Sequence, residues 1–92
     1  MPLTGVVFVI TGEFGAFGTR DKITERLESL GAVSKSGVSK KTTMLLMGDA
    51  PGATKLNAAK RLGIPIEGDS WLRKVYQKNG WECGGGFDIE EA

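Results

Sequence analysis

The most regular feature of the sequence is two short runs of apolar residues without a polar member. The runs at 6–10 and 44–47 are typical of strands buried on both faces of a parallel sheet. Shorter segments at 32–35 and 64–66 predict two weaker strands. Pro65 indicates that the last of these lies at a sheet edge, because proline has no N–H for a central ladder.

Between these segments, three stretches carry apolar residues at every third or fourth position, as in helices packed on one side. We expect helices at residues 20–30, 54–61 and 70–78, with Gly31 ending the first. The side chains expected to cap their first turns are Thr19, Thr54 and either Asp69 or Ser70. The order strand, helix, strand, strand, helix, strand, helix predicts an α/β sandwich with a mostly parallel sheet.

The connection between the second and third predicted strands decides the order of the sheet. It runs from residue 36 to 43 without a helix, whereas a parallel crossover needs about a dozen residues or more. We therefore expect the first strand to lie between these two. Ligands of open α/β sheets bind beyond the carboxyl ends of strands, where connections leave toward opposite faces. This rule predicts a crevice formed by the loops at 11–20 and 48–55.

Four residues in these loops carry groups that bind anions. Thr11 supplies a hydroxyl, Gly12 an unobstructed backbone N–H, and Arg20 and Lys55 stand at the starts of two helices. Two helix amino ends, two cations and a hydroxyl together suit a phosphate. Taken alone, each residue has an ordinary structural explanation as a strand end, a turn glycine or a solvated helix start. Their convergence on one crevice favours a phosphate site.

Glycine spacing and composition argue against a nucleotide-binding enzyme. Gly12, Gly15 and Gly18 are spaced by three, which differs from G-x-G-x-x-G, and no P-loop motif occurs. Histidine is absent and Cys83 is the one cysteine, which excludes Ser–His and Cys–His catalysis, Cys/His zinc sites and internal disulfides. We expect a binding module with no catalytic residue, no metal and no cofactor.

The overall composition describes one ordinary globular domain. The chain has 92 residues, of which 40% are hydrophobic and 25% charged. The first residues lack the features of a signal peptide, and no apolar run approaches the ~20 residues of a membrane span. A lone cysteine fits a reducing compartment. We expect an intracellular monomer, in the cytoplasm and nucleoid or in a eukaryotic nucleus, without a membrane partner.

Charge is distributed unevenly although the formal net charge is only +1. Residues 20–61 hold nine Lys or Arg against four Asp or Glu, whereas residues 62–92 hold three against six. The two segments therefore carry net charges of +5 and −3. Such asymmetry suits an anionic partner that meets one side of the domain, and it is equally compatible with an unevenly decorated, solvated surface.

Several motifs, taken in order, resemble the BRCT family. They are VVFVITGEF at 6–14, TRDKITERLESLGAVS at 19–34, VSKKTTMLLMGDAPGATKLNAAKRLGIPI at 38–66 and Trp71 in the third helix. The resemblance covers residues 4–77 and is greatest to the single BRCT domains of bacterial NAD-dependent DNA ligases and of the replication factor C large subunit. It implies a three-layer α/β sandwich: a four-stranded parallel sheet in the order 2-1-3-4, with two helices on one face and a third on the other.

The resemblance also implies a function and a set of residues. Domains of this branch bind DNA at a phosphorylated 5′ end and are not catalytic, although the parent protein can be a DNA ligase or another DNA-processing enzyme. By motif position, the phosphate-binding residues are Thr11, Gly12, Arg20 and Lys55. Possible contacts to the DNA backbone are Lys40, Lys41 and Thr42, unless they form only a solvated loop. The alternative is a module that binds a protein partner or a phosphopeptide, since tandem BRCT pairs hold phosphoserine with a similar residue set.

The aromatic residues and the chain end complete the expectations. Trp71 is expected to anchor the third helix to the core. Phe14 and Phe17 are expected to pin the loop that contains them, with stacking on an exposed DNA base as the alternative. The domain is expected to span residues 1–78, followed by a partly flexible tail at 79–92.

Overall fold

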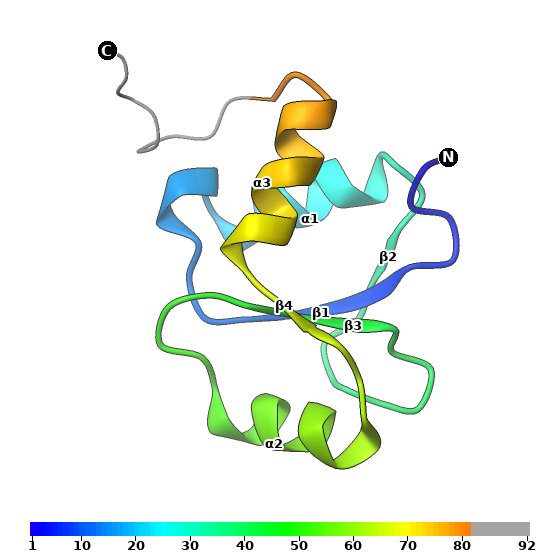
Figure 1. Ribbon diagram of the computed structural model, residues 1–92, viewed down its shortest axis with the longest axis vertical. Helices are drawn as coiled ribbons and strands as arrows, with labels where there is room; N and C mark the ends of the chain where they lie inside the picture. Colours follow the sequence, from blue (N-terminus) through cyan, green and yellow to red (C-terminus); the bar gives the residue numbers. More distant parts are fainter. Residues whose placement is uncertain (82–92) are drawn as a thin grey trace.

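Four parallel strands form one sheet in the computed structural model, which describes residues 1–81 (Figure 1). They are β1 (Val7–Thr11), β2 (Val33–Ser34), β3 (Met44–Met47) and β4 (Ile66–Glu67). Their order is β2-β1-β3-β4, so the expected topology is confirmed, with β4 at an edge. The short β2–β3 connection accounts for this order, because β1 separates the two strands that it joins.

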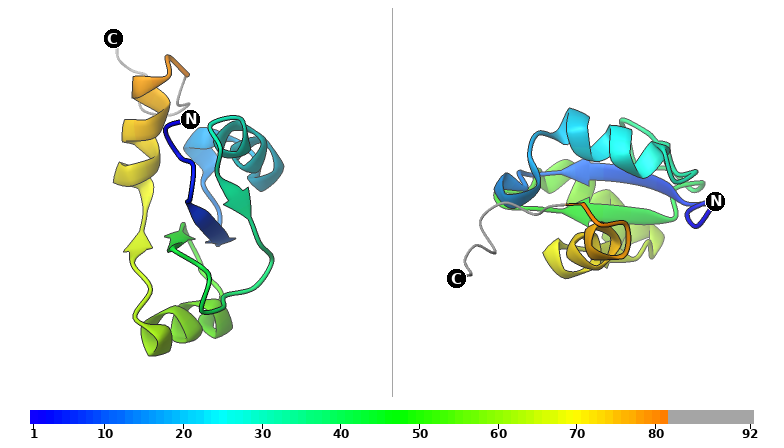
Figure 2. Two further views of the ribbon diagram at one scale, coloured as in Figure 1. Left: turned by 90° about the vertical axis from the view of Figure 1, so that its right-hand side faces the viewer. Right: turned by 90° about the horizontal axis from the view of Figure 1, so that it is seen from above.

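Helices cover both faces of the sheet and give three layers. Helices α1 (Arg20–Glu28) and α3 (Asp69–Lys78) lie on one face, and α2 (Ala53–Leu62) lies alone on the other (Figures 1 and 2). Side chains that alternate along β1 separate the two cores: Phe8 and Ile10 pack with α1 and α3, whereas Val9 packs with α2. The α/β BRCT-type architecture is thereby confirmed.

The capping predictions were right for one helix and wrong for two. The Thr19 hydroxyl caps α1 by accepting a hydrogen bond of 3.2 Å from the N–H of Lys22. Helix α2 begins one residue before Thr54, and Gly52 occupies its capping position without a side-chain hydrogen bond. Helix α3 starts after Gly68, so Asp69 lies within the first turn and pairs with Arg73 at 3.1 Å instead of capping. Glycine holds both capping positions, so neither has a side chain that could accept a hydrogen bond.

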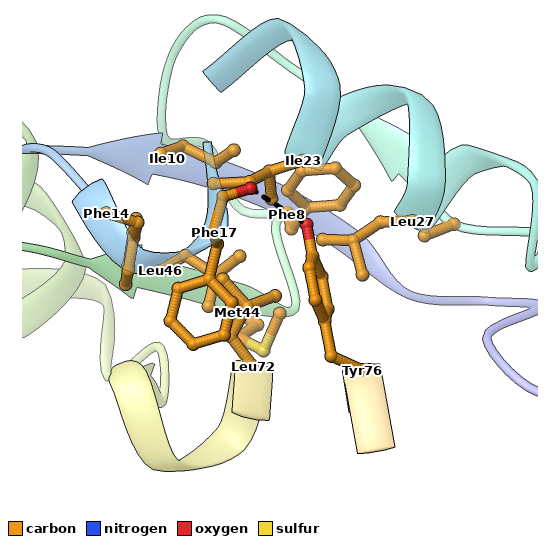
Figure 3. Close-up of a cluster of buried hydrophobic side chains, with 11 residues drawn as sticks. Phe8, Ile10, Phe14, Phe17, Ile23, Leu27, Met44, Leu46, Leu72 and Tyr76 are labelled. Carbon is orange, nitrogen blue, oxygen red and sulfur yellow. Dashed lines mark hydrogen bonds between the residues drawn. The ribbon is translucent and has the colours of Figure 1, made fainter. Parts of the chain in front are cut away.

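The larger of the two cores contains a group of packed aromatic rings (Figure 3). The Phe17 and Tyr76 rings meet edge to face with centroids 5.0 Å apart, and the Tyr76 hydroxyl donates to the Phe17 carbonyl at 3.5 Å. Phe14 is buried beside Phe17, with 5% of its surface exposed. These contacts support the expectation that both phenylalanines pin the loop after β1, and burial removes their faces from any stacking partner. Trp71 is half-buried and packs on the margin of this core.

Contacts with the domain continue past the end of α3. The N–H of Trp81 donates to the Tyr76 carbonyl at 2.9 Å, and its ring lies 5.3 Å from that of Tyr76. The Arg26 guanidinium lies over both rings, 5.4 Å from the Trp81 centroid and 5.3 Å from the Tyr76 centroid. The proposed domain end at residue 78 stays a prediction, because most of the segment 79–92 and Cys83 lie outside the described residues.

Candidate functional site

An open hollow of about 370 Å³ lies beyond the carboxyl end of β1, beside the first turn of α2. The structure brings together all four residues that the sequence assigned to a phosphate site. They share the hollow with part of the 48–55 loop, as expected for the carboxyl edge of an open α/β sheet. The lining residues are Thr11, Gly12, Glu13, Arg20, Ala50, Gly52, Ala53, Thr54 and Lys55.

Thr11 connects the sheet to α2. It is the last residue of β1, and only 3% of its surface is exposed. Its Oγ1 accepts a hydrogen bond of 2.7 Å from the N–H of Gly52. Within residues 1–81, the hydroxyl donates to no other group, so its proton is available to a ligand in the hollow.

Gly12 is required by the close approach of two loops. Its φ of +84° lies in the left-handed region, which side chains disfavour. A Cβ here would stand 2.5 Å from the Asp49 carbonyl oxygen. Glu13 and Asp49 exchange two backbone hydrogen bonds of 2.9 Å directly after this glycine. Gly12 therefore has a structural role and also lines the hollow.

The first turn of α2 presents free backbone amides to the hollow. Because Gly52 has no side chain to cap the helix, the N–H groups of Ala53, Thr54 and Lys55 find no hydrogen-bond acceptor within the described chain. These amides also carry the positive end of the helix dipole. A bound anion would fill the missing cap, which is the usual geometry of phosphate sites at helix amino ends.

Two cations line the hollow. Lys55 is half-buried in the first turn of α2, and Arg20 is the exposed first residue of α1. Neither pairs with a carboxylate among residues 1–81, where Arg73–Asp69 is the one ion pair. The exposed Glu13 carboxylate also lines the hollow and opposes an anion. The two cations, the amides and the helix dipole outweigh this single negative charge.

The two helix amino ends beside the hollow differ in their capping. At the start of α1, Thr19 satisfies the N–H of Lys22, and Arg20 is the one residue of this helix that lines the hollow. At the start of α2, the three successive residues Ala53, Thr54 and Lys55 line the hollow, and their first turn has no side-chain cap. The sequence did not predict this difference, because Thr54 was expected to cap α2. It also missed Glu13, which no motif singled out.

The other candidate segment, Lys40 to Thr42, lies apart from the hollow. It precedes β3, whereas the hollow follows β1 and β3, so the length of a strand, about 13 Å, separates them. Lys40 and Lys41 are exposed. Thr42 is 5% exposed, and its Oγ1 accepts from the Ser39 N–H at 3.0 Å. A single phosphate cannot contact both the hollow and the segment Lys40 to Thr42. A partner that contacts both must therefore be extended.

The described part of the chain offers neither a cluster of metal ligands nor a membrane-spanning helix. Residues 1–81 contain no group of three or more His, Cys, Asp or Glu side chains placed to hold a metal ion. No helix among these residues is both long and apolar enough to cross a bilayer.

Comparison with known proteins identifies the family. The sequence model of the BRCA1 C Terminus (BRCT) domain matches residues 1–76, so the chain belongs to the BRCT family. Two similar curated proteins are DNA ligases. That of Marinobacter nauticus is 40% identical over 81 residues, which cover 88% of this chain and 12% of the ligase. That of Methylococcus capsulatus is 42% identical over 66 residues, which cover 72% and 10%. The chain thus spans about a tenth of the length of these relatives.

Proposed function

We propose that this BRCT domain is a non-catalytic DNA-binding module that recognises a 5′-phosphorylated DNA end. The terminal phosphate would occupy the hollow, held by Thr11, Gly12, Arg20 and Lys55. The observation that carries the proposal is the uncapped first turn of α2, whose free amides face the same hollow as the Thr11 hydroxyl and two unpaired cations.

The number of donors favours a terminal phosphate over an internal one. A phosphate monoester has three free oxygens and a charge of about −1.5 to −2 at pH 7. A phosphodiester within a strand has two free oxygens and a single charge. The hollow offers a hydroxyl, several amides, a guanidinium and an ammonium, so a monoester satisfies more of them. It also gains more from the two cations, because charge-assisted hydrogen bonds are roughly twice as strong as neutral ones.

DNA is the favoured carrier of this phosphate for two reasons. The relatives are DNA ligases, and the segment at residues 20–61 has a net charge of +5. Lys40 and Lys41 would contact the DNA backbone, while Thr42 shapes their loop through its hydrogen bond with Ser39. A role in DNA replication or repair, and a location inside the cell, follow from this partner.

A phosphoserine-containing protein is the second candidate partner, because the hollow recognises a phosphate monoester whatever carries it. Peptides would have to gain their specificity from residues beside the phosphate. Competition between a phosphorylated DNA hairpin and a phosphoserine peptide separates the two: we expect the hairpin to displace the peptide at far lower concentration.

The central test compares one labelled hairpin duplex with a 5′-phosphate or a 5′-hydroxyl, by fluorescence anisotropy at two salt concentrations. We expect tighter binding of the phosphorylated hairpin, and a loss of that preference in Lys55→Ala. Lys74→Ala, which removes an exposed lysine from α3, is the control and should keep it. Equal binding of both hairpins by the native protein would refute end recognition, and no binding of either would favour a protein partner.

A further inference from the structure

The two helices that flank the hollow differ in the charge of their exposed surfaces. On α2, Thr54, Asn57 and Arg61 are exposed and spaced as neighbours on one helix face, and exposed Lys60 lies beside them. All of these side chains donate hydrogen bonds, and α2 contains no acidic residue. Thr54 also lines the hollow, so this row begins at the proposed phosphate site.

Helix α1 presents the opposite character. Asp21, Glu25 and Glu28 are exposed and follow one another at spacings of four and three, so they form one acidic row. Helix α1 also carries three cations: Arg20, which lines the hollow, the exposed Lys22, and Arg26. Arg26, however, is half-buried and lies over the Tyr76 and Trp81 rings. A DNA strand that crossed α1 would therefore meet a line of carboxylates.

The β2–β3 connection extends the basic surface of α2. In both Figure 1 and the left view of Figure 2, this segment, residues 35–43, reaches the level of α2. Val38 anchors it by packing against the core that contains Ala59 and Ile64. The connection carries Lys35, Lys40 and Lys41, all exposed, and no acid.

From these placements we infer that the DNA strand leaving the hollow runs along α2 toward the β2–β3 connection, rather than across α1. This inference rests on the proposed function for the position of the first phosphate. The contact surface, called the α2 path below, consists of Thr54, Asn57, Lys60, Arg61, Lys40 and Lys41. Lys60 and Arg61 are thereby assigned to backbone phosphates beyond the DNA end.

The length of α2 and the spacing of phosphates in DNA set how many phosphates this helix can contact. Helix α2 has 10 residues and is about 15 Å long at about 1.5 Å per residue. Each strand of duplex DNA places a phosphate about every 3.4 Å along the axis. With the duplex axis parallel to α2, the helix alone therefore spans about four phosphates after the terminal one, and Lys40 and Lys41 extend the path beyond its end.

Neutral linkages test this footprint directly. The probe is a 5′-phosphorylated DNA hairpin, which has one open end, with methylphosphonates in place of the charged linkages at nucleotides 2–5. We expect the native protein to bind it roughly tenfold more weakly than the unmodified hairpin. The matched control carries the same number of neutral linkages at nucleotides 9–12 and should bind within twofold of the unmodified hairpin. Equal weakening by both probes would overturn the path.

Paired variants test the protein side. The double variant Lys60→Ala with Arg61→Ala should bind the unmodified hairpin roughly tenfold more weakly and lose about two from the slope of log affinity against log salt. It should also become less sensitive to the neutral linkages at nucleotides 2–5, because only Lys40 and Lys41 then remain as cations of the path. The control double variant, Lys74→Ala with Lys78→Ala, removes the same charge from exposed positions of α3 and should stay within twofold. Equal losses in the two variants would reject the assignment of Lys60 and Arg61.

Two further comparisons distinguish a failure of the α2 path from a failure of 5′-phosphate recognition. Neutralising the α1 row with Asp21→Asn, Glu25→Gln and Glu28→Gln should change affinity less than twofold; an increase of tenfold would place the strand over α1 instead. The ratio of affinities for 5′-phosphate and 5′-hydroxyl hairpins should be the same in Lys60→Ala/Arg61→Ala as in the native protein. A ratio of one in the native protein would refute end recognition, while the α2 and α3 variants would still decide the path.

Discussion

The Thr11 hydroxyl accepts a hydrogen bond of 2.7 Å from the backbone N–H of Gly52, a residue 41 positions further along the chain. This bond fixes the end of β1 against the start of α2 and so sets the geometry of the hollow. Because the oxygen accepts from Gly52, its own proton is left for a ligand. Folding and proposed binding therefore depend on the same side-chain atom.

The variant Thr11→Val removes the hydroxyl, on which both roles depend, and leaves the side-chain volume nearly unchanged. Valine has nearly the shape of threonine but cannot accept the Gly52 N–H or donate to a phosphate. We expect the free energy of unfolding, measured by urea denaturation, to fall by about 1 kcal/mol. The preference for a 5′-phosphate over a 5′-hydroxyl should fall roughly tenfold, as one lost hydrogen bond to a charged group implies.

The conservative variant Thr11→Ser is the control for this prediction. It keeps the hydroxyl and loses one methyl group, so it should keep most of the phosphate preference. If Thr11→Val retained the full preference in the same anisotropy assay, the hydroxyl would have no part in binding, and Thr11 would be a structural residue alone.

Gly12→Ala should destabilise the fold by about 2 kcal/mol or more, through two effects that act together. The left-handed φ of +84° disfavours any side chain, and the new Cβ would stand 2.5 Å from the Asp49 carbonyl oxygen. Gly15→Ala is the matched control, since a Cβ there meets no atom within 4 Å. Urea denaturation should show little change for Gly15→Ala; similar losses at both positions would contradict the assigned role of Gly12.

The sheet order could be predicted from the sequence because one short segment decides it. Residues 36–43 cannot hold a crossover helix, and this alone separates β2 from β3. The central strands were equally clear, since apolar runs buried on both faces have no polar interruption. Strand β2 was harder to delimit: the expected 32–35 reduces to Val33–Ser34, where pairing with β1 sets the limits.

The chemistry of the hollow was only partly predictable. Arg20 and Lys55 were found because charged residues at helix starts can be read from the sequence. The free amides of α2 could not, because they depend on which residue occupies the cap. Thr54 has a strong capping preference, yet the bond between Thr11 and Gly52 is consistent with a helix start fixed earlier, at Ala53. A long-range contact of this kind leaves no local signal in the sequence.

The two cations of the hollow should contribute separately to binding. Arg20→Ala and Lys55→Ala are each expected to weaken binding of a 5′-phosphorylated hairpin by ~1–3 kcal/mol, if each makes a charge-assisted hydrogen bond. Anisotropy titrations measure this loss. Lys22→Ala is the control, because Lys22 is an exposed cation of α1 that does not line the hollow. A loss in Lys22→Ala as large as in Arg20→Ala would indicate a general charge effect instead of a specific pocket.

Gly52→Asp should move stability and binding in opposite directions. Gly52 has φ −73° and ψ 129°, an extended conformation open to any residue. An aspartate there can accept from the free amides of α2 and favours the helix dipole. Its Cβ would lie 3.2 Å from Thr11 Oγ1, so the Thr11 side chain must shift by a few tenths of an ångström. We expect a net gain of about 0.5 kcal/mol in the free energy of unfolding.

The same carboxylate should abolish recognition of the 5′-phosphate, because it occupies the amides that the phosphate needs and places a negative charge beside them. Gly52→Asn separates these two effects, since it caps the helix without adding charge. We expect Asn to weaken the phosphate preference and Asp to eliminate it, while thermal melts stay at or above the native value for both. A Gly52→Asp protein that still preferred the phosphorylated hairpin would show that the phosphate binds elsewhere. The proposed site therefore depends on the missing side-chain cap of α2. Supplying that cap with a side chain at position 52 is the most direct test of the site.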